Sequence, residues 1–175
     1  MFRFFQHAEH DFGMRIADYT GGDLRNAIPR ESFATIVVPS IKKAQFEKFM
    51  KGYEKMYVAE FKEADPDIKL IFKVADAPAK VMNEADQYRI IRGVFVCPNG
   101  VQRMSASMPG VVETSNNLSI VRIGNGKFEA FCLCRSSVES AKEATAWKIA
   151  AGFQLAGCEV ELSGSYPGWK PDMNS

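Results

Sequence analysis

An Asn-Gly pair, Asn125-Gly126, constrains the fold of this chain more than any other feature. The pair separates two segments, 118–123 and 127–135, in which apolar and polar residues alternate. Asn-Gly is the preferred centre of a type I′ turn, whose twist matches that of two antiparallel strands. The two segments therefore predict a β-hairpin, around which an antiparallel sheet must form.

The residues after this hairpin predict a helix and a further strand. Ser136 precedes Glu139 by three residues. This is the spacing of a capping box, in which each side chain bonds the backbone amide of the other residue. We expect the helix to run to about Ala156, with Gly157 just beyond its end in a left-handed conformation. Residues 158–162 are expected to form the last strand.

The first half of the chain has a similar order of elements. A helix is expected over 1–12 and a strand over 14–20. A second strand is expected over 31–39, and because it is apolar on both faces it is predicted to be central in the sheet. Ser40 is expected to cap an amphipathic helix that ends before the Asp-Pro-Asp segment at 65–67.

Each half then closes in the same way, which indicates a weak internal β-β-α-β repeat. A strand is expected over 68–74, followed by a helix over 80–92. The residues expected to face inward on that helix are Val81, Ala85, Tyr88, Ile90 and Ile91. Helices on one face of a mainly antiparallel sheet give an α+β fold, here an open-faced, ferredoxin-like sandwich.

Composition limits the class of protein. A chain of 175 residues suits one domain, and 22 Lys and Arg against 21 Asp and Glu give a net charge of +1. This balance offers no support for binding to nucleic acid or to an anionic membrane. The apolar runs are too short to span a bilayer. Four cysteines are too few for a disulfide framework at this size, which favours a reducing, cytoplasmic location.

The sequence by itself contains no recognisable catalytic apparatus. His7 and His10 are its only histidines, and they would share one face of the first helix. Zinc normally takes three or four protein ligands, so we interpret both as solvated side chains. A cysteine nucleophile would need a histidine base, and neither histidine is free for that role. No nucleotide-binding or hydrolase motif is present.

Two polar residues, Asn26 and Arg135, remain open to a structural and a functional interpretation. Asn26 precedes an apolar strand, and Arg135 ends one. Asn26 would satisfy turn backbone and Arg135 would lie at a sheet edge if their roles were structural. An arginine is also the side chain best shaped to bind a carboxylate through two parallel hydrogen bonds. The residues alone favour the structural interpretation.

Four segments of the chain carry distinctive sequences. They are 21–31 (GGDLRNAIPRE), 110–118 (GVVETSNNL), 132–136 (CLCRS) and 164–172 (GSYPGWKPD). The last is rich in Gly, Pro and large aromatic residues, is typical of a shaped linker, and suggests a piece of a larger protein. In this order the segments resemble motifs of the bacterial aminoacyl-histidine dipeptidases, also called Xaa-His or cytosolic non-specific dipeptidases.

This resemblance implies an origin in a zinc-dependent exopeptidase with two domains. In that family a catalytic domain binds two zinc ions, and a lid domain closes over the dipeptide substrate and mediates homodimer contacts. Residues 1–163 would be the lid, and 164–175 would begin the linker back to the catalytic domain. The ligands of the zinc ions would lie outside this chain, which alone would bind no metal and would be inactive.

The resemblance also assigns roles to residues of this chain. Asn26 matches the lid asparagine that faces the reaction centre, and Arg135 matches the arginine that binds the free carboxylate of the substrate. Arg30, Thr114 and Asn117 match motif positions without an expected substrate contact, and Asn117 is expected to satisfy loop backbone. No catalytic residue and no metal ligand is assigned. The alternative is a stand-alone ferredoxin-like module for binding or dimerisation.

Overall fold

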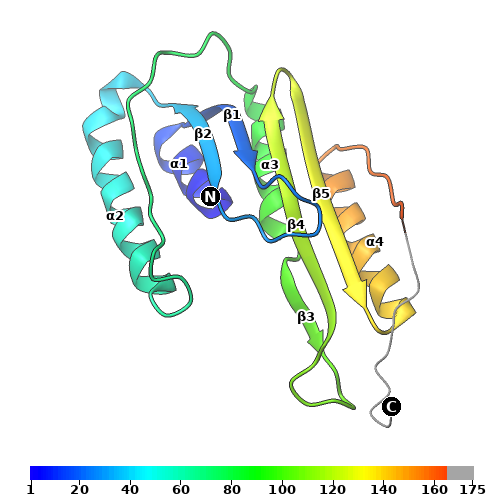
Figure 1. The fold of residues 1–175 in the computed structure, drawn as a ribbon. Coiled ribbons are helices and arrows are strands. Elements are labelled where there is room, and N and C mark those ends of the chain that lie inside the picture. Colours follow the sequence, from blue (N-terminus) through cyan, green and yellow to red (C-terminus); the bar gives the residue numbers. More distant parts are fainter. Residues whose placement is uncertain (165–175) are drawn as a thin grey trace.

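The computed structural model describes residues 1–164, which form an open antiparallel sheet with helices packed against it (Figure 1). The elements of these residues are, in chain order, α1 (Phe2–Phe12), β1 (Arg15–Gly21), β2 (Ser32–Val37), a short 3₁₀ helix (Ser40–Lys42), α2 (Lys43–Phe61), α3 (Glu84–Val96), β3 (Gly100–Met104), β4 (Val112–Gly124), β5 (Lys127–Ser136) and α4 (Glu139–Leu155). The predicted α+β class is therefore confirmed.

Strand β4 organises the sheet. Strand β5 pairs with it along almost its whole length, from the pair Thr114–Ser136 to the turn. On the other edge of β4, β1 pairs with residues 121–123 and β3 pairs with residues 112–116. Strand β2 pairs with β1 and lies at the end of the sheet.

The predicted hairpin is confirmed as β4 and β5. Asn125 and Gly126 have φ angles of 51° and 75°. A type I′ turn requires positive φ at both central residues, and these two residue types adopt it most easily. The turn fixes the register of the hairpin, in which alternate residues of β5 face the helices.

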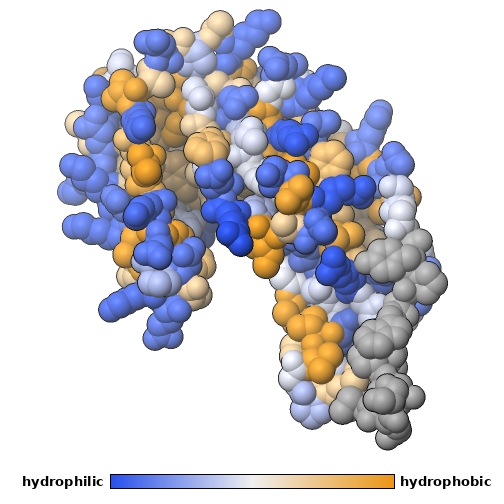
Figure 2. Space-filling view, viewed as in Figure 1, coloured by the Kyte–Doolittle hydropathy of each residue, from blue (hydrophilic) through white to orange (hydrophobic). Residues whose placement is uncertain are grey.

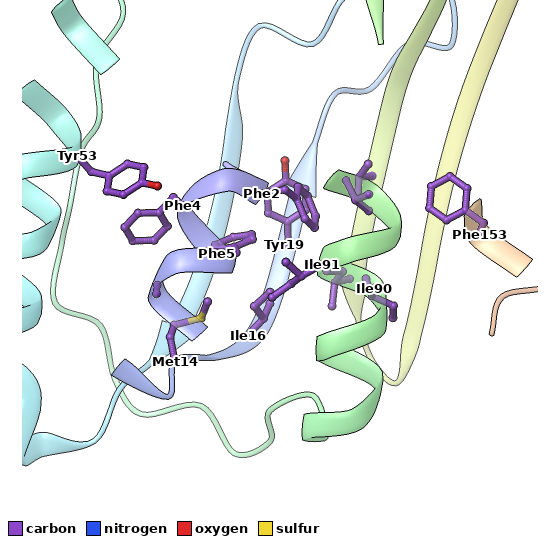
Figure 3. Packing of buried hydrophobic residues seen from close by; sticks show 14 of the residues in the cluster. Phe2, Phe4, Phe5, Met14, Ile16, Tyr19, Tyr53, Ile90, Ile91 and Phe153 are labelled. Atoms are coloured by element: carbon purple, nitrogen blue, oxygen red, sulfur yellow. The ribbon is translucent and has the colours of Figure 1, made fainter. Parts of the chain in front are cut away.

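The hydrophobic core lies between the sheet and the helices α1 and α3 (Figure 3). Its largest fully buried apolar side chains are Phe5, Met14, Ile16 and Ile91. Helix α2 extends this core with aromatic side chains: Phe4 of α1 stacks on Phe49, and its ring meets the Tyr53 ring edge-on. The apolar face of the predicted amphipathic helix thus packs inward through its aromatic residues.

Strand β2 is not central, so that prediction is wrong. Only β1 pairs with β2, and the Phe33 side chain is 63% exposed. Apolar residues on both faces are typical of a strand covered on both sides, but the position of a strand depends on which partners reach its edges. In residues 1–164, no strand pairs with the outer edge of β2.

The two predicted closing strands do not form. Residues 68–74 and 158–162 are irregular, and Ile71 and Val74 are 74% and 90% exposed. Cys158, by contrast, packs against the core without joining the sheet. The described halves therefore share a β-β-α order, with an extended segment after each helix. Strand propensity alone produced these two predictions, and propensity does not supply a pairing partner.

The predicted serine caps are also wrong. Ser40 begins the 3₁₀ helix and makes no capping bond. Ser136 ends β5, and its hydroxyl accepts a hydrogen bond from the Val138 amide at 3.0 Å, so α4 begins only at Glu139. Gly157 is confirmed just beyond Ala156, the C-cap of α4, because its φ is 83° and its amide bonds the Gln154 carbonyl at 2.9 Å.

Helix α3 begins later than predicted. The Asn83 side chain accepts a hydrogen bond from the Asp86 amide at 2.9 Å, which caps the helix. Ile90 and Ile91 face inward as expected, but Tyr88 is largely exposed. Val81 precedes the helix and is also exposed, and Ala85 is exposed in the first turn. Strand β3 was not predicted, and only its pairing with β4 identifies it.

Candidate functional site

The loop between β1 and β2 lies against β4 on the sheet face opposite the helices (Figure 1). Asn117 of β4 donates a hydrogen bond from its side-chain amide to the Ala27 carbonyl at 2.7 Å. At the start of the loop, Gly22 has φ of 71°, and a Cβ there would lie 1.9 Å from the Ser119 carbonyl oxygen. Only glycine permits this approach of the two backbones, so the loop is held at two points.

Asn26 lies in the turn at the tip of this loop. The Ala27 amide bonds the Leu24 carbonyl at 3.2 Å, which closes the turn. The Asn26 side chain is exposed and makes no hydrogen bond with any residue that the structure describes. The structural interpretation of Asn26, in which its amide satisfies turn backbone, therefore finds no support. Its donor and acceptor remain available to a ligand.

Arg135 is the penultimate residue of β5 and is exposed. It pairs in register with Ser115, and no carboxylate among residues 1–164 forms an ion pair with it. The backbone that carries it is well fixed. The Thr114 and Ser136 hydroxyls are 2.8 Å apart, and the Ser137 amide bonds the Glu113 carbonyl at 3.1 Å.

The nearest carboxylate along β4, that of Glu113, is already paired. It accepts hydrogen bonds from the Arg103 guanidinium and, at 3.1 Å, from the Thr114 hydroxyl. Lys142, on α4, forms an ion pair with Glu139 at 2.8 Å. The charge of Arg135 is therefore not neutralised by the paired groups around it, and the guanidinium can accept an anion.

One broad, open groove, with a volume of about 2480 Å³, is lined by both Asn26 and Arg135. Its lining on this side of the sheet also includes Ser115, Phe131 and Leu133. The groove continues around the free edge of β5 toward α4. Polar and apolar side chains are interleaved over this face of the molecule (Figure 2). The structure thus brings together in one groove two residues that are 109 positions apart (135 − 26).

The two histidines do not form a metal site. The Nδ1 atom of His7 lies 2.5 Å from the Tyr53 hydroxyl, and that of His10 lies 2.7 Å from an Asp11 carboxylate oxygen. Both side chains are exposed, as predicted. No group of three or more His, Cys, Asp or Glu residues within 1–164 is arranged to hold a metal ion. The described residues therefore do not fit a zinc ion.

The cysteines show an arrangement that the sequence did not predict. Cys132 and Cys134 face the helices, and the Cys97 sulfur lies 3.8 Å from that of Cys132. Burial raises the pKa of the Cys134 thiol to about 11, and the thiol donates to the Asn116 Oδ1 atom at 3.3 Å. Cys97 follows α3 and Cys132 lies on β5, so only the tertiary structure brings the two sulfurs together.

Membrane insertion receives no support from the helices of residues 1–164. None of them combines the length and apolar character that crossing a bilayer requires. The linker predicted from residue 164 onward, including Tyr166 and Trp169, lies outside the described residues. The division into 1–163 and 164–175 therefore stays a prediction.

Comparison with known proteins identifies relatives of this chain. No protein-family model matches it. The cytosol non-specific dipeptidase of Escherichia coli (strain K12) is 39% identical over 171 residues, which are 97% of this chain and 35% of that protein. The crystal structure of the aminoacylhistidine dipeptidase from Vibrio alginolyticus superposes with a TM-score of 0.92 at 36% identity, over 99% of this chain and 36% of that one.

In sequence and fold, the chain corresponds to a segment of the cytosol non-specific and aminoacylhistidine dipeptidases. The resemblance predicted from the four motifs is thereby confirmed. The chain spans about a third of the length of each of these relatives.

Proposed function

We propose that this chain is the substrate-covering lid domain of a zinc-dependent dipeptidase that hydrolyses dipeptides of the Xaa-His type. The observation that carries the proposal is the match of nearly the whole chain to about a third of two dipeptidases, at 39% and 36% identity. Such a segment corresponds to one part of an enzyme, and the remaining two thirds of the relatives' length can contain a catalytic domain. The lid alone is inactive, because the catalytic machinery belongs to that other domain.

Arg135 binds the free carboxylate of the dipeptide. Its guanidinium is exposed on a fixed strand end and has no carboxylate partner among the described residues. A planar guanidinium can bind a carboxylate through two parallel hydrogen bonds. Only a peptide with its carboxyl terminus at the reaction site offers that group. The contact would therefore favour dipeptides over longer chains.

Asn26 contacts the substrate on the side of the reaction centre. Its side chain has both a donor and an acceptor, and neither is used within residues 1–164. The hydrogen bond from Asn117 to the Ala27 carbonyl fixes the backbone next to it. Preorganisation of this kind reduces the entropy that substrate binding must otherwise overcome.

The two zinc ions of the parent enzyme are bound by its catalytic domain. The described residues of the lid hold no fitting set of ligands, so no step of hydrolysis is assigned to them. The lid contributes by binding and orienting the substrate and by excluding water from the closed cleft.

A homodimer is the proposed assembly. The cytoplasm is the proposed location, and the name of the Escherichia coli relative places that protein in the cytosol.

A second candidate is a stand-alone ferredoxin-like module for binding or dimerisation. Within residues 1–164, the outer edges of β2 and β5 have no strand partner. This favours the second candidate, because an unpaired strand edge can add a strand from a partner. The two candidate functions differ in the sequence that they require before and after this chain in the full-length protein. A reading frame that encodes His, Asp and Glu ligand segments on both sides supports the lid.

A hybrid enzyme tests the proposed function directly. The corresponding segment of the Escherichia coli relative is replaced by this chain, and hydrolysis of a His-containing dipeptide is measured with zinc present. We expect the hybrid to hydrolyse the dipeptide and the isolated chain to be inactive. A folded hybrid that binds zinc in its catalytic domain but has no activity would contradict the lid assignment, as would turnover by the isolated chain.

A further inference from the structure

Two thiols from distant parts of the chain meet between α3 and β5. Cys97 is the first residue after α3, and Cys132 lies in the middle of β5. Their sulfur atoms are 3.8 Å apart, which is close to van der Waals contact. A disulfide bond has a sulfur–sulfur distance of about 2.05 Å, so a movement of under about 2 Å joins them.

Both cysteines are partly buried. Cys132 lines the open groove, so a small oxidant in solution can reach it. The Cys97 amide bonds the Val94 carbonyl at 3.3 Å, and the next residue, Pro98, accepts a hydrogen bond from the Asn116 side chain at 2.6 Å. The backbone around Cys97 is therefore held to α3 and to β4. The shift that joins the two sulfurs falls mainly to the two side chains, which rotate about χ1.

We propose that Cys97 and Cys132 form a thiol–disulfide site, which a small disulfide such as oxidised glutathione converts to an intramolecular disulfide bond. The inference does not depend on the dipeptidase assignment. It rests on the contact between the two sulfurs and on the access to Cys132 from the groove.

The two thiols, Cys97 and Cys132, have different roles in the exchange reaction. Either thiol can donate to the other across this contact. A hydrogen bond donated by Cys97 lowers the pKa of Cys132 and raises that of Cys97. The thiolate is the nucleophile in disulfide exchange. Cys132 therefore attacks first and Cys97 second. The high pKa of Cys134 keeps it a thiol at neutral pH and excludes it from the first step.

The exchange is balanced in two steps. The Cys132 thiolate attacks one sulfur of oxidised glutathione, forms a mixed disulfide and releases one glutathione thiolate. Cys97 then loses its proton to solvent and attacks the Cys132 sulfur, which releases the second glutathione thiolate. Two protein thiols are oxidised and one glutathione disulfide is reduced. Reduced glutathione or dithiothreitol reverses the sequence.

The disulfide would fasten the end of α3 to β5, and both elements contribute side chains to the core. It would also close a loop of 35 residues (132 − 97), which restricts the unfolded chain and raises Tm. Arg135 lies three residues beyond Cys132 on the same strand. The cross-link would therefore fix the strand from which this guanidinium projects.

Mass spectrometry of the 175-residue chain tests the proposal. The chain is incubated with oxidised glutathione at neutral pH, and the intact mass and the non-reduced peptide map are recorded. We expect the loss of two hydrogen atoms without a retained glutathione, a peptide linkage between Cys97 and Cys132, and a Tm that rises and returns on reduction. A wild-type chain that keeps the glutathione adduct, or that links Cys132 to Cys134, overturns the proposal.

Serine variants separate the two roles, with a correct fold confirmed by circular dichroism. Cys97→Ser should stop at a stable glutathione adduct on Cys132, and Cys132→Ser should form neither adduct nor linkage. Cys158→Ser is the matched control, since Cys158 is also partly buried but makes no contact with another sulfur, and it should oxidise like the wild type. Loss of the linkage in the Cys158 variant would contradict the assignment.

Discussion

Gln87 accepts a hydrogen bond from the backbone amide of Ile16, at 2.7 Å, through a side chain that is fully buried. The same side chain donates to the Met14 carbonyl at 2.8 Å and to a Glu9 carboxylate oxygen at 3.0 Å. A residue of α3 therefore satisfies the backbone at the start of β1. Without this glutamine, buried peptide groups there would lose their partners.

We expect Gln87→Leu to lower the free energy of unfolding by about 2–4 kcal/mol, because an unpaired buried polar group costs about 1–3 kcal/mol and more than one would result. Urea denaturation of the 175-residue chain measures this change in the free energy of unfolding. The control is Gln154→Leu, at an exposed position of α4. Equal stability of both variants would mean that water replaces the lost bonds of Gln87.

Asn117→Ala should release the loop between β1 and β2. The hydrogen bond to the Ala27 carbonyl disappears, so amides of residues 22–31 should exchange with deuterium faster. The global stability should fall by only about 1 kcal/mol. The control is Asn116→Ala, which removes a bond to the Pro98 carbonyl on the other face of β4 and should leave the loop unchanged. Unchanged loop exchange in Asn117→Ala would exclude this positioning role.

Arg135→Ala should lower kcat/KM of the hybrid dipeptidase by two orders of magnitude or more, at about 1.4 kcal/mol per tenfold. Arg135→Lys should recover only part of the activity, because lysine lacks the planar fork. The isolated chain should keep its stability, since Arg135 is exposed. Arg122, also exposed on β4, provides the control. Near-normal activity of the alanine variant would return Arg135 to a structural role.

Self-association should depend on the outer face of α4. Trp147 and Leu155 lie two turns apart on this helix and are 66% and 87% exposed. Large exposed apolar side chains favour association. We expect the chain to self-associate in light scattering, and the double variant Trp147→Lys, Leu155→Lys to be more monomeric. Ile71→Lys, at another exposed site, should have no effect. A wild-type monomer at high concentration would contradict this prediction.

Alkylation should reveal the interaction between the two contacting thiols. The hydrogen bond from Cys97 lowers the pKa of Cys132, so iodoacetamide should modify Cys132 at a lower pH than Cys134 or Cys158. Cys97→Ala removes the donor and should shift the Cys132 profile to higher pH. The rate in each case rises with pH because the thiolate reacts. Coincident profiles before and after the substitution would argue against the contact.

Local chemistry was predictable from the sequence, whereas pairing across the sheet was not. Asn125-Gly126 and Gly157 specify their turns through their own backbone preferences, and both predictions are confirmed. Residues 31–39 and 68–74 have strand propensity, but no property of these residues indicates which edge they meet. The first lies at the end of the sheet, and the second forms no strand.

In the candidate site, too, residue types could be predicted from the sequence, whereas their spatial arrangement could not. Asn26 and Arg135 were identified through motifs that resemble a family, and neither residue type alone distinguishes a ligand contact from a surface position. Their common groove follows from the loop that lies against β4, which the sequence does not reveal. The contact between Cys97 and Cys132 joins the end of α3 to β5, and it thus depends on tertiary structure alone.

Among residues 1–164, three strands pair with β4, and this has a consequence for the order of folding. The β4–β5 hairpin closes through a two-residue turn, whereas the pair Tyr19–Ile123 joins residues 104 positions apart (123 − 19). The entropy cost of loop closure rises with the length of the loop, and non-local pairing slows folding. We therefore expect β4 and β5 to pair early in folding. The edge of β4 that binds β1 would then stay exposed until β1, from the beginning of the chain, pairs with it.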